Sequence, residues 1–182
     1  MNVTSIPFGV ADVTIGEGPD ALKFDGVEYF QAEGGELSIE PLLSEITFQD
    51  FGEGAYDDYI NGFTPTLNLV VGQNDLKLMQ KLFAYHSEIV TEGGEVTGLT
   101  DERIGKSMRS KAVPVHIHPR EMGNDHSLDI HIYKMSGVGA YNRTYESAQG
   151  TFPVELKGYP RDGADPSKPG NYYYIGETDP NA

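Results

Sequence analysis

The residues best suited to chemistry lie in the segment VHIHPREMGNDHSLDIHIYK, residues 115–134. His116 and His118 alternate with apolar residues, so both imidazoles are expected on one face of a strand. On the following strand Asp129, His131 and Tyr133 share a face. If the two strands pair, histidines and a carboxylate converge in a way that suits zinc or non-haem iron.

The same alternation is also explained by a two-stranded ribbon with one buried face and one polar face. Because that simpler interpretation accounts for the whole pattern, we expect no metal, no other cofactor and no catalytic residue. A metal-dependent enzyme on a small β-barrel, using His116, His118 and His131, stays open as an alternative function. A ligand-binding β-sandwich module with exposed tyrosines, such as Tyr172 to Tyr174, is another.

The charge balance excludes some classes of partner. The chain has 28 acidic and 13 basic residues, a net charge of −15. Such a surface repels nucleic acid, so sequence-specific DNA reading is not expected. Solubility is the simplest explanation, and a surface that faces DNA without holding it is the functional one. No apolar run approaches the length of a membrane span, so we expect no membrane partner.

Breakers recur at short intervals along the chain, which indicates many short strands. Asp25-Gly26 is a two-residue hairpin signal. In ELSIE, Leu37 and Ile39 point to one side while Glu36, Ser38 and Glu40 point to the other. The predicted strands are Ala11–Ile15, Leu22–Phe24, Val27–Gln31, Glu36–Pro41, Ser44–Phe48, Thr64–Val71, Val113–His118, Leu128–Met135, Phe152–Tyr159 and Tyr172–Ile175.

One amphipathic helix is predicted at about residues 74–86. Gln73, Asn74 and Asp75 supply capping groups for its first turn. Leu76, Met79, Leu82 and Phe83 form a stripe, with Leu76 and Phe83 expected to face inward. The fold class is therefore mainly β: a β-sandwich or barrel with one packed helix and long inter-subunit loops, in a single domain spanning 1–182.

Two polar segments, 91–112 and 160–182, are predicted to be flexible excursions from this domain. The first holds the one basic cluster in the chain: Arg103, Lys106, Arg109 and Lys111. Such a cluster is either a solvated loop or a contact with an acidic neighbour.

The segment FQDFGEGAYDDYINGFTPTLNLVV, residues 48–71, begins like a strand, turns glycine-rich and acidic, and returns as a strand. We expect its middle, about 49–61, to be a flexible loop. Gly52 and Gly54 give it high chain entropy, so an isolated subunit should not order Phe51, Tyr56 and Tyr59.

Taken in order, the features of residues 11–88 resemble the tail tube (major tail) proteins of long-tailed bacteriophages. The resemblance covers a little under half of the chain, and no alignable pattern follows residue 89. The histidine-rich ribbon and the basic loop depart from the family pattern. The matching positions are Phe24, Asp25, Gly26, Gly34, Gly35, Leu37, Glu40, Glu45, Ile46, Asp50, Gly52, Asp57, Gly62, Leu67 and Leu69.

The resemblance implies a structural virion protein, not an enzyme, that forms hexameric rings stacked into a tail tube through which DNA passes without specific binding. It implies partners in further copies of the chain and in tape measure and tail terminator or tip proteins, with assembly in the host cytoplasm and final location in the virion tail. The inter-subunit loop would contain Gln49, Asp50, Phe51, Gly52, Tyr56, Asp57, Asp58 and Tyr59. Candidates for the lumen face are Glu36, Ser38, Glu40, Asp129 and His131.

Overall fold

The computed structural model describes residues 9–145, 147 and 150–182. Within this part of the chain, no helix is long and apolar enough to cross a membrane. The strands and the one α-helix found there are β1 (Ala11–Ile15), β2 (Leu22–Phe24), β3 (Gln31–Ile46), β4 (Asp57–Val71), α1 (Leu76–Leu82), β5 (His86–Val90), β6 (Val96–Asp101), β7 (Val113–Pro119), β8 (Ile130–Gly137), β9 (Phe152–Tyr159) and β10 (Tyr173–Ile175).

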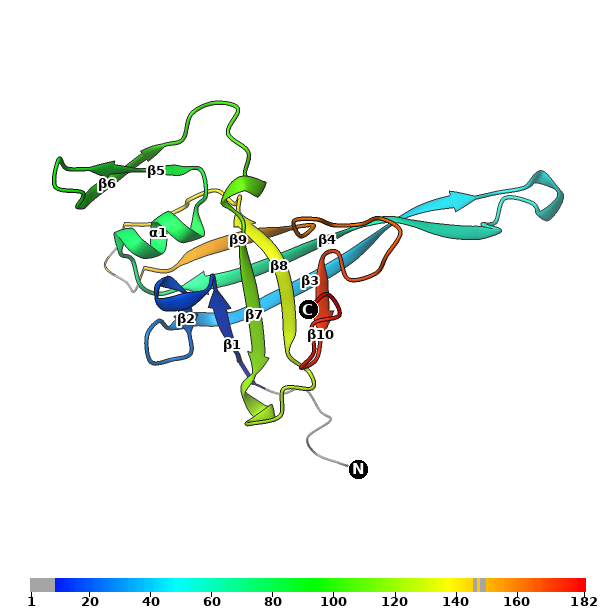
Figure 1. The fold of residues 1–182 in the computed structure, drawn as a ribbon, viewed down its shortest axis with the longest axis horizontal. Coiled ribbons are helices and arrows are strands. Elements are labelled where there is room, and N and C mark those ends of the chain that lie inside the picture. The colour runs from blue at the N-terminus through cyan, green and yellow to red at the C-terminus, as the bar shows by residue number, and fades with distance from the viewer. Residues whose placement is uncertain (1–8, 146, 148–149) are drawn as a thin grey trace.

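Most strands belong to one antiparallel sheet in the order β2-β1-β7-β8-β9-β4-β3. β10 pairs with residues 130–132 of β8, before the part of β8 that pairs with β9. β5 and β6 form a separate hairpin. Figure 1 shows that β1, β7 and β8 run across the direction of β3, β4 and β9, so the sheet is strongly bent between β8 and β9. The prediction of a mainly β, sandwich-like fold with one helix is confirmed.

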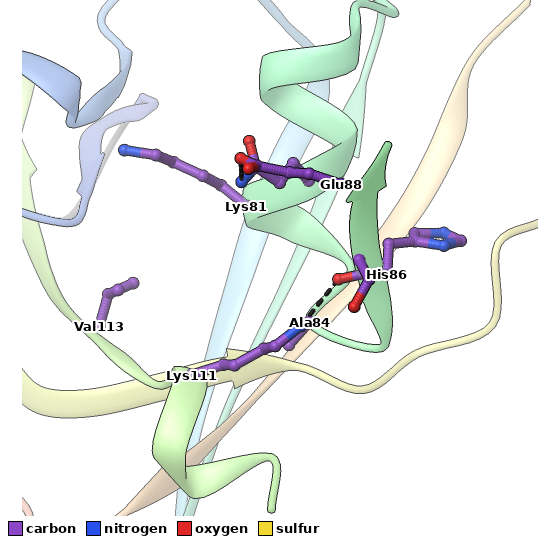
Figure 2. A pocket seen from close by; sticks show the side chains of 8 residues that line it. Lys81, Ala84, His86, Glu88, Lys111 and Val113 are labelled. Carbon is purple, nitrogen blue, oxygen red and sulfur yellow. Dashed lines mark hydrogen bonds between the residues drawn. The ribbon is translucent and has the colours of Figure 1, made fainter. Parts of the chain in front are cut away.

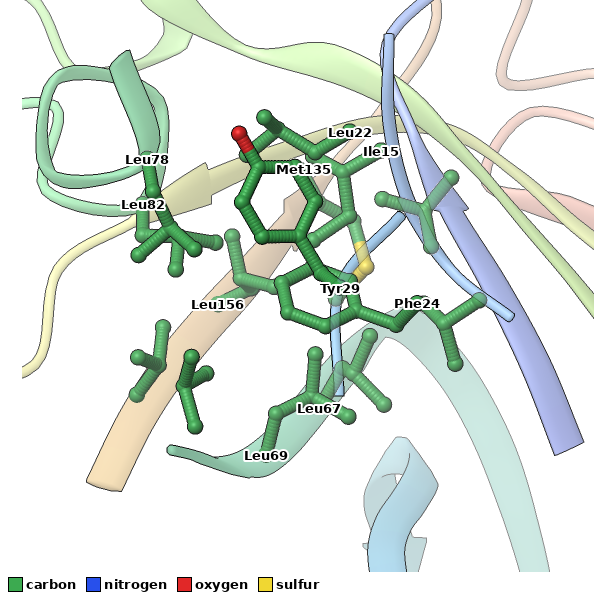
Figure 3. Close-up of a cluster of buried hydrophobic side chains, with 14 of the residues drawn as sticks. Ile15, Leu22, Phe24, Tyr29, Leu67, Leu69, Leu78, Leu82, Met135 and Leu156 are labelled. Atoms are coloured by element: carbon green, nitrogen blue, oxygen red, sulfur yellow. The ribbon is translucent and has the colours of Figure 1, made fainter. Parts of the chain in front are cut away.

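The hydrophobic core lies inside this bend and is covered by α1 (Figure 3). Alternate residues of the strands that line the core point inward, as in β9, where Phe152, Val154 and Leu156 are buried and the residues between them are exposed. The labelled side chains of Figure 3 come from β1, β2, β4, α1, β8, β9 and the segment before β3. They are Ile15, Leu22, Phe24, Tyr29, Leu67, Leu69, Leu78, Leu82, Met135 and Leu156.

The helix is shorter than predicted and buries a different stripe. Asp75 is its N-cap and accepts a hydrogen bond from the backbone N–H of Leu78 at 2.8 Å. Leu78 and Leu82, one turn apart, are fully buried, whereas Leu76 is 43% exposed. The prediction that Leu76 faces inward was wrong, because the helix packs the side that carries Leu78 and Leu82 against the sheet. The prediction for Phe83 was right, since it is buried just after the last turn.

A glycine on β8 fixes how closely the end of the helix approaches the sheet. A Cβ added to Gly137 would lie 1.6 Å from the carbonyl oxygen of Leu82. The backbone N–H of Ala84 donates to the carbonyl of Gly137 at 3.1 Å. The sheet and helix therefore meet backbone to backbone here, and no other residue fits at this position.

The predicted strand Val27–Gln31 and its two-residue hairpin do not form. The Asp25 carboxylate instead accepts the backbone N–H groups of Val27 and Glu28, at 2.8 and 2.9 Å. This turn satisfies the backbone locally and leads into β3, which begins only at Gln31. The two strands predicted between Glu36 and Phe48 are one strand, because Leu42 and Leu43, which the prediction left between them, also belong to β3.

The segments predicted as flexible excursions contain regular structure. Residues 91–112 include β6, which pairs with β5, and residues 160–182 include β10, which pairs with β8. Two members of the basic cluster have acidic partners in their own chain: Lys111 Nζ lies 2.6 Å from Glu102, and Arg109 lies 2.9 Å from Asp162.

The packing of α1 predicts that Leu82→Ala lowers the free energy of unfolding by about 2–5 kcal/mol, because it leaves a cavity in a fully buried site. The matched variant Leu76→Ala, on the exposed side of the same helix, should cost less than about 1 kcal/mol. Urea denaturation of both variants measures the difference. Equal losses would show that the helix does not have the phase described here.

Candidate assembly surface and histidine cluster

The most unusual feature of the molecule is a two-stranded projection, which we call the arm and define as residues 42–62. β9 pairs with β4 only from Thr66 to Val71, whereas β3 continues to pair with β4 as far as Ile46 and Asp57. The hairpin therefore extends well beyond the rest of the sheet (Figure 1). An isolated two-stranded ribbon is at best marginally stable in water. Among the described residues, no third strand pairs with the arm to support it.

The arm exposes an unusual amount of apolar surface. Seven of its large apolar side chains have exposed fractions between 49% and 68%, and Ile46 is half-buried. Leu43 and Ile60 are directly paired across the strands, and Ser44 pairs with Tyr59. Since neighbouring residues on a strand point to opposite faces, Leu43 and Ile60 lie on one face and Leu42 and Tyr59 on the other. The exposed set is Leu42, Leu43, Phe48, Phe51, Tyr56, Tyr59 and Ile60.

The tip of the arm forms its own small aromatic cluster. The Tyr56 ring lies 5.1 Å from that of Phe48 and 5.2 Å from that of Phe51. A 3₁₀ turn over Gln49–Phe51 and Gly52, at φ +83°, reverse the chain, and the Tyr56 N–H donates to the Ile46 carbonyl at 2.7 Å. The expected loop of about 49–61 is therefore wrong in extent.

The loop at the tip lies between Ile46 and Asp57, where β3 ends and β4 begins. Asp57, Asp58 and Tyr59 are strand residues. Gln49, Asp50, Phe51, Gly52 and Tyr56 do belong to the tip, and all of them are exposed.

The arm is also acidic. No lysine or arginine occurs between Lys23 and Lys77, so the arm carries carboxylates without any basic side chain of its own. Its acidic residues, all exposed, are Glu45, Asp50, Glu53, Asp57 and Asp58. A surface that covers the arm must therefore be apolar and must not add further negative charge.

The second candidate site is a cluster of histidines around one buried carboxylate at the turn between β7 and β8. The two strands pair with His116 opposite His131, so the structure does bring these residues together with His118 and Asp129. Asp129 is 1% exposed. Its Oδ1 lies 2.5 Å from His118 Nδ1, and its Oδ2 lies 2.7 Å from His116 Nε2 and 2.8 Å from His126 Nδ1.

Sequence reasoning missed two members of this cluster. His126 lies in the turn, outside the strand alternation, and its one sequence signal is its position three residues before Asp129. Tyr174 comes from β10 and stacks on His131 at 4.4 Å with an angle of 6° between the rings. Asp129 cannot face a lumen because it is buried, and both ring faces of His131 are covered, by His116 and Tyr174.

Electrostatics in the cluster follow from the buried charge. Burial alone raises the pKa of Asp129, but hydrogen bonds with His118, His126 and His116 outweigh it and place that pKa below its usual value. The hydrogen bond to Asp129 raises the pKa of His118 despite the opposing effect of burial. Burial lowers the pKa of His131, which favours a neutral ring in the stack.

Two cavities of the molecule are candidate ligand sites. A cavity of about 700 Å³ lies at the root of the arm, between Ile60, Phe63, Tyr172 and Tyr173. Tyr172 to Tyr174 are half-buried, and Tyr173 and Tyr174 contact the core and His131, so these three are not the exposed tyrosines expected of a binding module.

The other cavity, of about 390 Å³, lies beside α1 and β5 (Figure 2). Its charged side chains are engaged with other groups. Lys111 donates to the His86 carbonyl at 2.8 Å, Lys81 to the Asp20 carbonyl, and Glu88 accepts from Gln80. The cavity therefore offers no set of converging polar groups among the described residues that line it.

Comparison with protein-family models gives no match, and comparison with curated proteins gives none either. Any assignment of function must therefore be argued from the arm, the charge distribution and the histidine cluster. What these features define is a class: a mainly β protein with an exposed, apolar and acidic hairpin arm.

The buried carboxylate predicts that Asp129→Ala lowers the free energy of unfolding by about 3–5 kcal/mol in buffer containing EDTA, because three imidazoles lose their common acceptor. Asp125→Ala, an exposed position in the same turn, is the control and should cost about 1 kcal/mol or less. Thermal and urea denaturation of both variants test this. A loss at Asp129 no larger than that at Asp125 would contradict the described burial of charge.

Proposed function

We propose that this protein is a structural subunit that assembles with identical copies through its arm, and that the assembly is the stacked, hexameric tail tube of a long-tailed bacteriophage. The observation that supports it most is the arm: a ribbon with exposed apolar side chains on both faces, with which no third strand of the described part of the chain pairs. Monomeric proteins rarely expose such a continuous apolar surface, and aromatic residues are the usual anchors of interfaces.

The strand edges support the same proposal. β3 is the last strand of the sheet and pairs with β4 alone along its length, from Gln31 to Ile46. A long unpaired edge is a template for pairing with another chain. On the arm the outer edge of β4 is also free of β9, so a neighbouring copy can extend the sheet on either side. Neighbouring copies of the same chain can both cover the faces of the arm and pair with its edges.

The position of the arm favours a ring over a two-fold dimer. The arm lies at one end of the molecule, far from the body of the sheet (Figure 1). When the arm of one copy contacts the body of the next, two different surfaces meet, and repetition of such a contact closes into a ring or continues as a filament. Rings that stack give a tube.

The charge distribution suits a conduit for DNA. The net charge is −15, and a lumen lined by carboxylates repels phosphate and does not retain it. Among the lumen candidates, Glu36 and Glu40 are exposed on β3 and Ser38 is half-buried, so we keep these three as proposed lumen residues. Asp129 and His131 are no longer proposed, because Asp129 is buried and both ring faces of His131 are covered. The proposal carries with it tape measure and tail terminator or tip proteins as partners, and the virion tail as location.

Purified wild-type protein at high concentration is expected to form rings or tubes by negative-stain electron microscopy. The double variant Leu43→Glu/Ile60→Glu, which places charges on one face of the arm, should remain monomeric by light scattering with an unchanged melting temperature. Val27→Glu is the matched control, since Val27 is 84% exposed and lies outside the arm. A wild-type chain that stays monomeric, or a double variant that assembles normally, would overturn the proposal.

Hydrogen exchange provides an independent prediction. In the monomer, amides of residues 42–62 should exchange quickly, because a two-stranded ribbon opens easily. In the assembled state they should gain at least about tenfold protection, which corresponds to about 1.4 kcal/mol. Peptides from the buried strand β9 serve as the internal control and should be equally protected in both states. Equal protection of the arm before and after assembly would be inconsistent with its burial between subunits.

A further inference from the structure

We propose that His118, His126 and Asp129 form a binding site for a divalent transition-metal ion of the zinc type. The site is separate from the arm and does not depend on the proposed assembly. Its donor atoms are two imidazole Nδ1 atoms and one carboxylate, and all three lie within 4.8 Å of one another. Two imidazoles with one carboxylate are a common ligand set for Zn²⁺.

The hydrogen bonding of His118 shows that an additional positive charge, from a proton or a metal ion, is needed here. His118 Nε2 lies 3.0 Å from the carbonyl oxygen of Gly123, which can only accept, so Nε2 carries the hydrogen. In a neutral ring Nδ1 is then an unprotonated acceptor, and it lies 2.5 Å from Oδ1 of the Asp129 carboxylate. Two acceptors at that distance repel each other unless a positive charge lies between or on them. That charge is either an extra proton or a metal ion.

The surroundings of the three residues match those of a metal site. A histidine that binds a metal through one nitrogen usually donates its other N–H to a backbone carbonyl, as His118 does to Gly123. His116 Nε2 lies 2.7 Å from Asp129 Oδ2 and is placed to donate to it, which holds the carboxylate in orientation from the second layer. His116 is therefore a positioning residue and not a ligand in this proposal.

Ring orientation separates this trio from the neighbouring one of His116, His131 and Asp129. The rings of His116 and His131 are stacked at 4.3 Å with only 13° between their planes. Nitrogen lone pairs lie in the ring plane, so those of two stacked rings run parallel and do not converge on one ion. The rings of His118 and His126 are 4.9 Å apart and tilted by 44°, which allows their nitrogens to converge.

The site can also be reached and can adjust. The side chain of His126 is 53% exposed, whereas that of Asp129 is 2% exposed, so the ion enters from the turn side and solvent supplies its remaining ligand. Zinc bonds to nitrogen and oxygen are about 2.0–2.2 Å long, so ligand atoms around the ion lie roughly 3–3.5 Å apart. Rotation of the exposed His126 ring, together with a small shift of His118, provides that spacing. Nitrogen donors favour zinc, nickel, cobalt or copper over magnesium or calcium.

The expected role of the ion is to fasten the turn between β7 and β8. The ligands come from β7, from the turn itself and from the residue before β8. An ion that binds the folded chain and not the unfolded one raises stability by mass action. Metal binding should therefore raise the melting temperature of the full chain in a concentration-dependent way.

The test uses the full chain, with any affinity tag removed, stripped with EDTA and then titrated with Zn²⁺ and Co²⁺. One ion per chain is expected by calorimetry, with a visible Co²⁺ absorption spectrum of the four-coordinate type and a rise in melting temperature. His126→Ala should weaken Zn²⁺ binding by at least about tenfold and remove the Co²⁺ spectrum. The variant is expected to fold, because His126 is exposed.

Two further variants make the outcome decisive. His86→Ala, the one histidine outside the cluster, should bind Zn²⁺ as tightly as the wild type. His131→Ala should bind Zn²⁺ with an affinity within about threefold of the wild type, because the stacked trio is not the site. The proposal is overturned if the folded wild type binds no ion, since a proton then holds the cluster together. It is also overturned if His131→Ala and not His126→Ala abolishes binding, or if His86→Ala weakens binding equally.

Discussion

The structure depends on the unequal lengths of three neighbouring strands. β4 pairs with β9 over residues 66–71 but with β3 as far as residue 57, so the hydrogen-bonded ladder continues after the layer beneath it has ended. Within the body, alternate residues of β4 are buried against the core, as Leu67, Leu69 and Val71 show. Between Gly62 and Ile60 the pairing with β3 shifts register, and from Asn61 to Asp57 side chains on both sides of the ribbon are exposed. The arm is thus an extension of the sheet that the chain itself cannot complete.

The body that carries the arm is held together by close contact between helix and sheet. Leu78 and Leu82 fill the bend of the sheet, and Gly137 lets the end of α1 meet β8 through backbone atoms. At the other end of β8, Asp129 gathers three imidazoles and fixes the turn after β7. The packing of α1 at one end of β8 and the hydrogen bonds of Asp129 at the other hold the bent sheet that carries the arm.

Sequence patterns predicted those parts of the fold that depend on local alternation. The bounds of the strands Ala11–Ile15, Leu22–Phe24 and Phe152–Tyr159 agree with the structure, because each alternates strictly and is bounded by turn residues. The β5–β6 hairpin was missed because its strands expose most of their residues and carry no apolar period. In the histidine cluster, the pairing of His116 with His131 followed from alternation, but the contribution of His126 and the stacking of Tyr174 depend on turn geometry and on a distant strand. Burial of Asp129 was not predictable, since a carboxylate is normally expected at the surface.

The order already present at the tip of the arm bears on how assembly would proceed. A fully disordered loop would lose its conformational entropy on binding, which weakens association for each residue that must be fixed. Here the ladder of β3 and β4, the turn at Gln49–Phe51 and the contacts of Tyr56 with Phe48 and Phe51 define the hairpin before any neighbour is present. The hairpin shape is therefore already available to the monomer, although a two-stranded ribbon also opens easily, and a neighbour that covers the arm holds it closed through apolar contact and edge pairing. An arm that is shaped in advance but uncovered favours association with a surface of one defined geometry over indiscriminate aggregation. No basic residue lies between Lys23 and Lys77 to oppose its carboxylates, and these charges keep arms from pairing with one another.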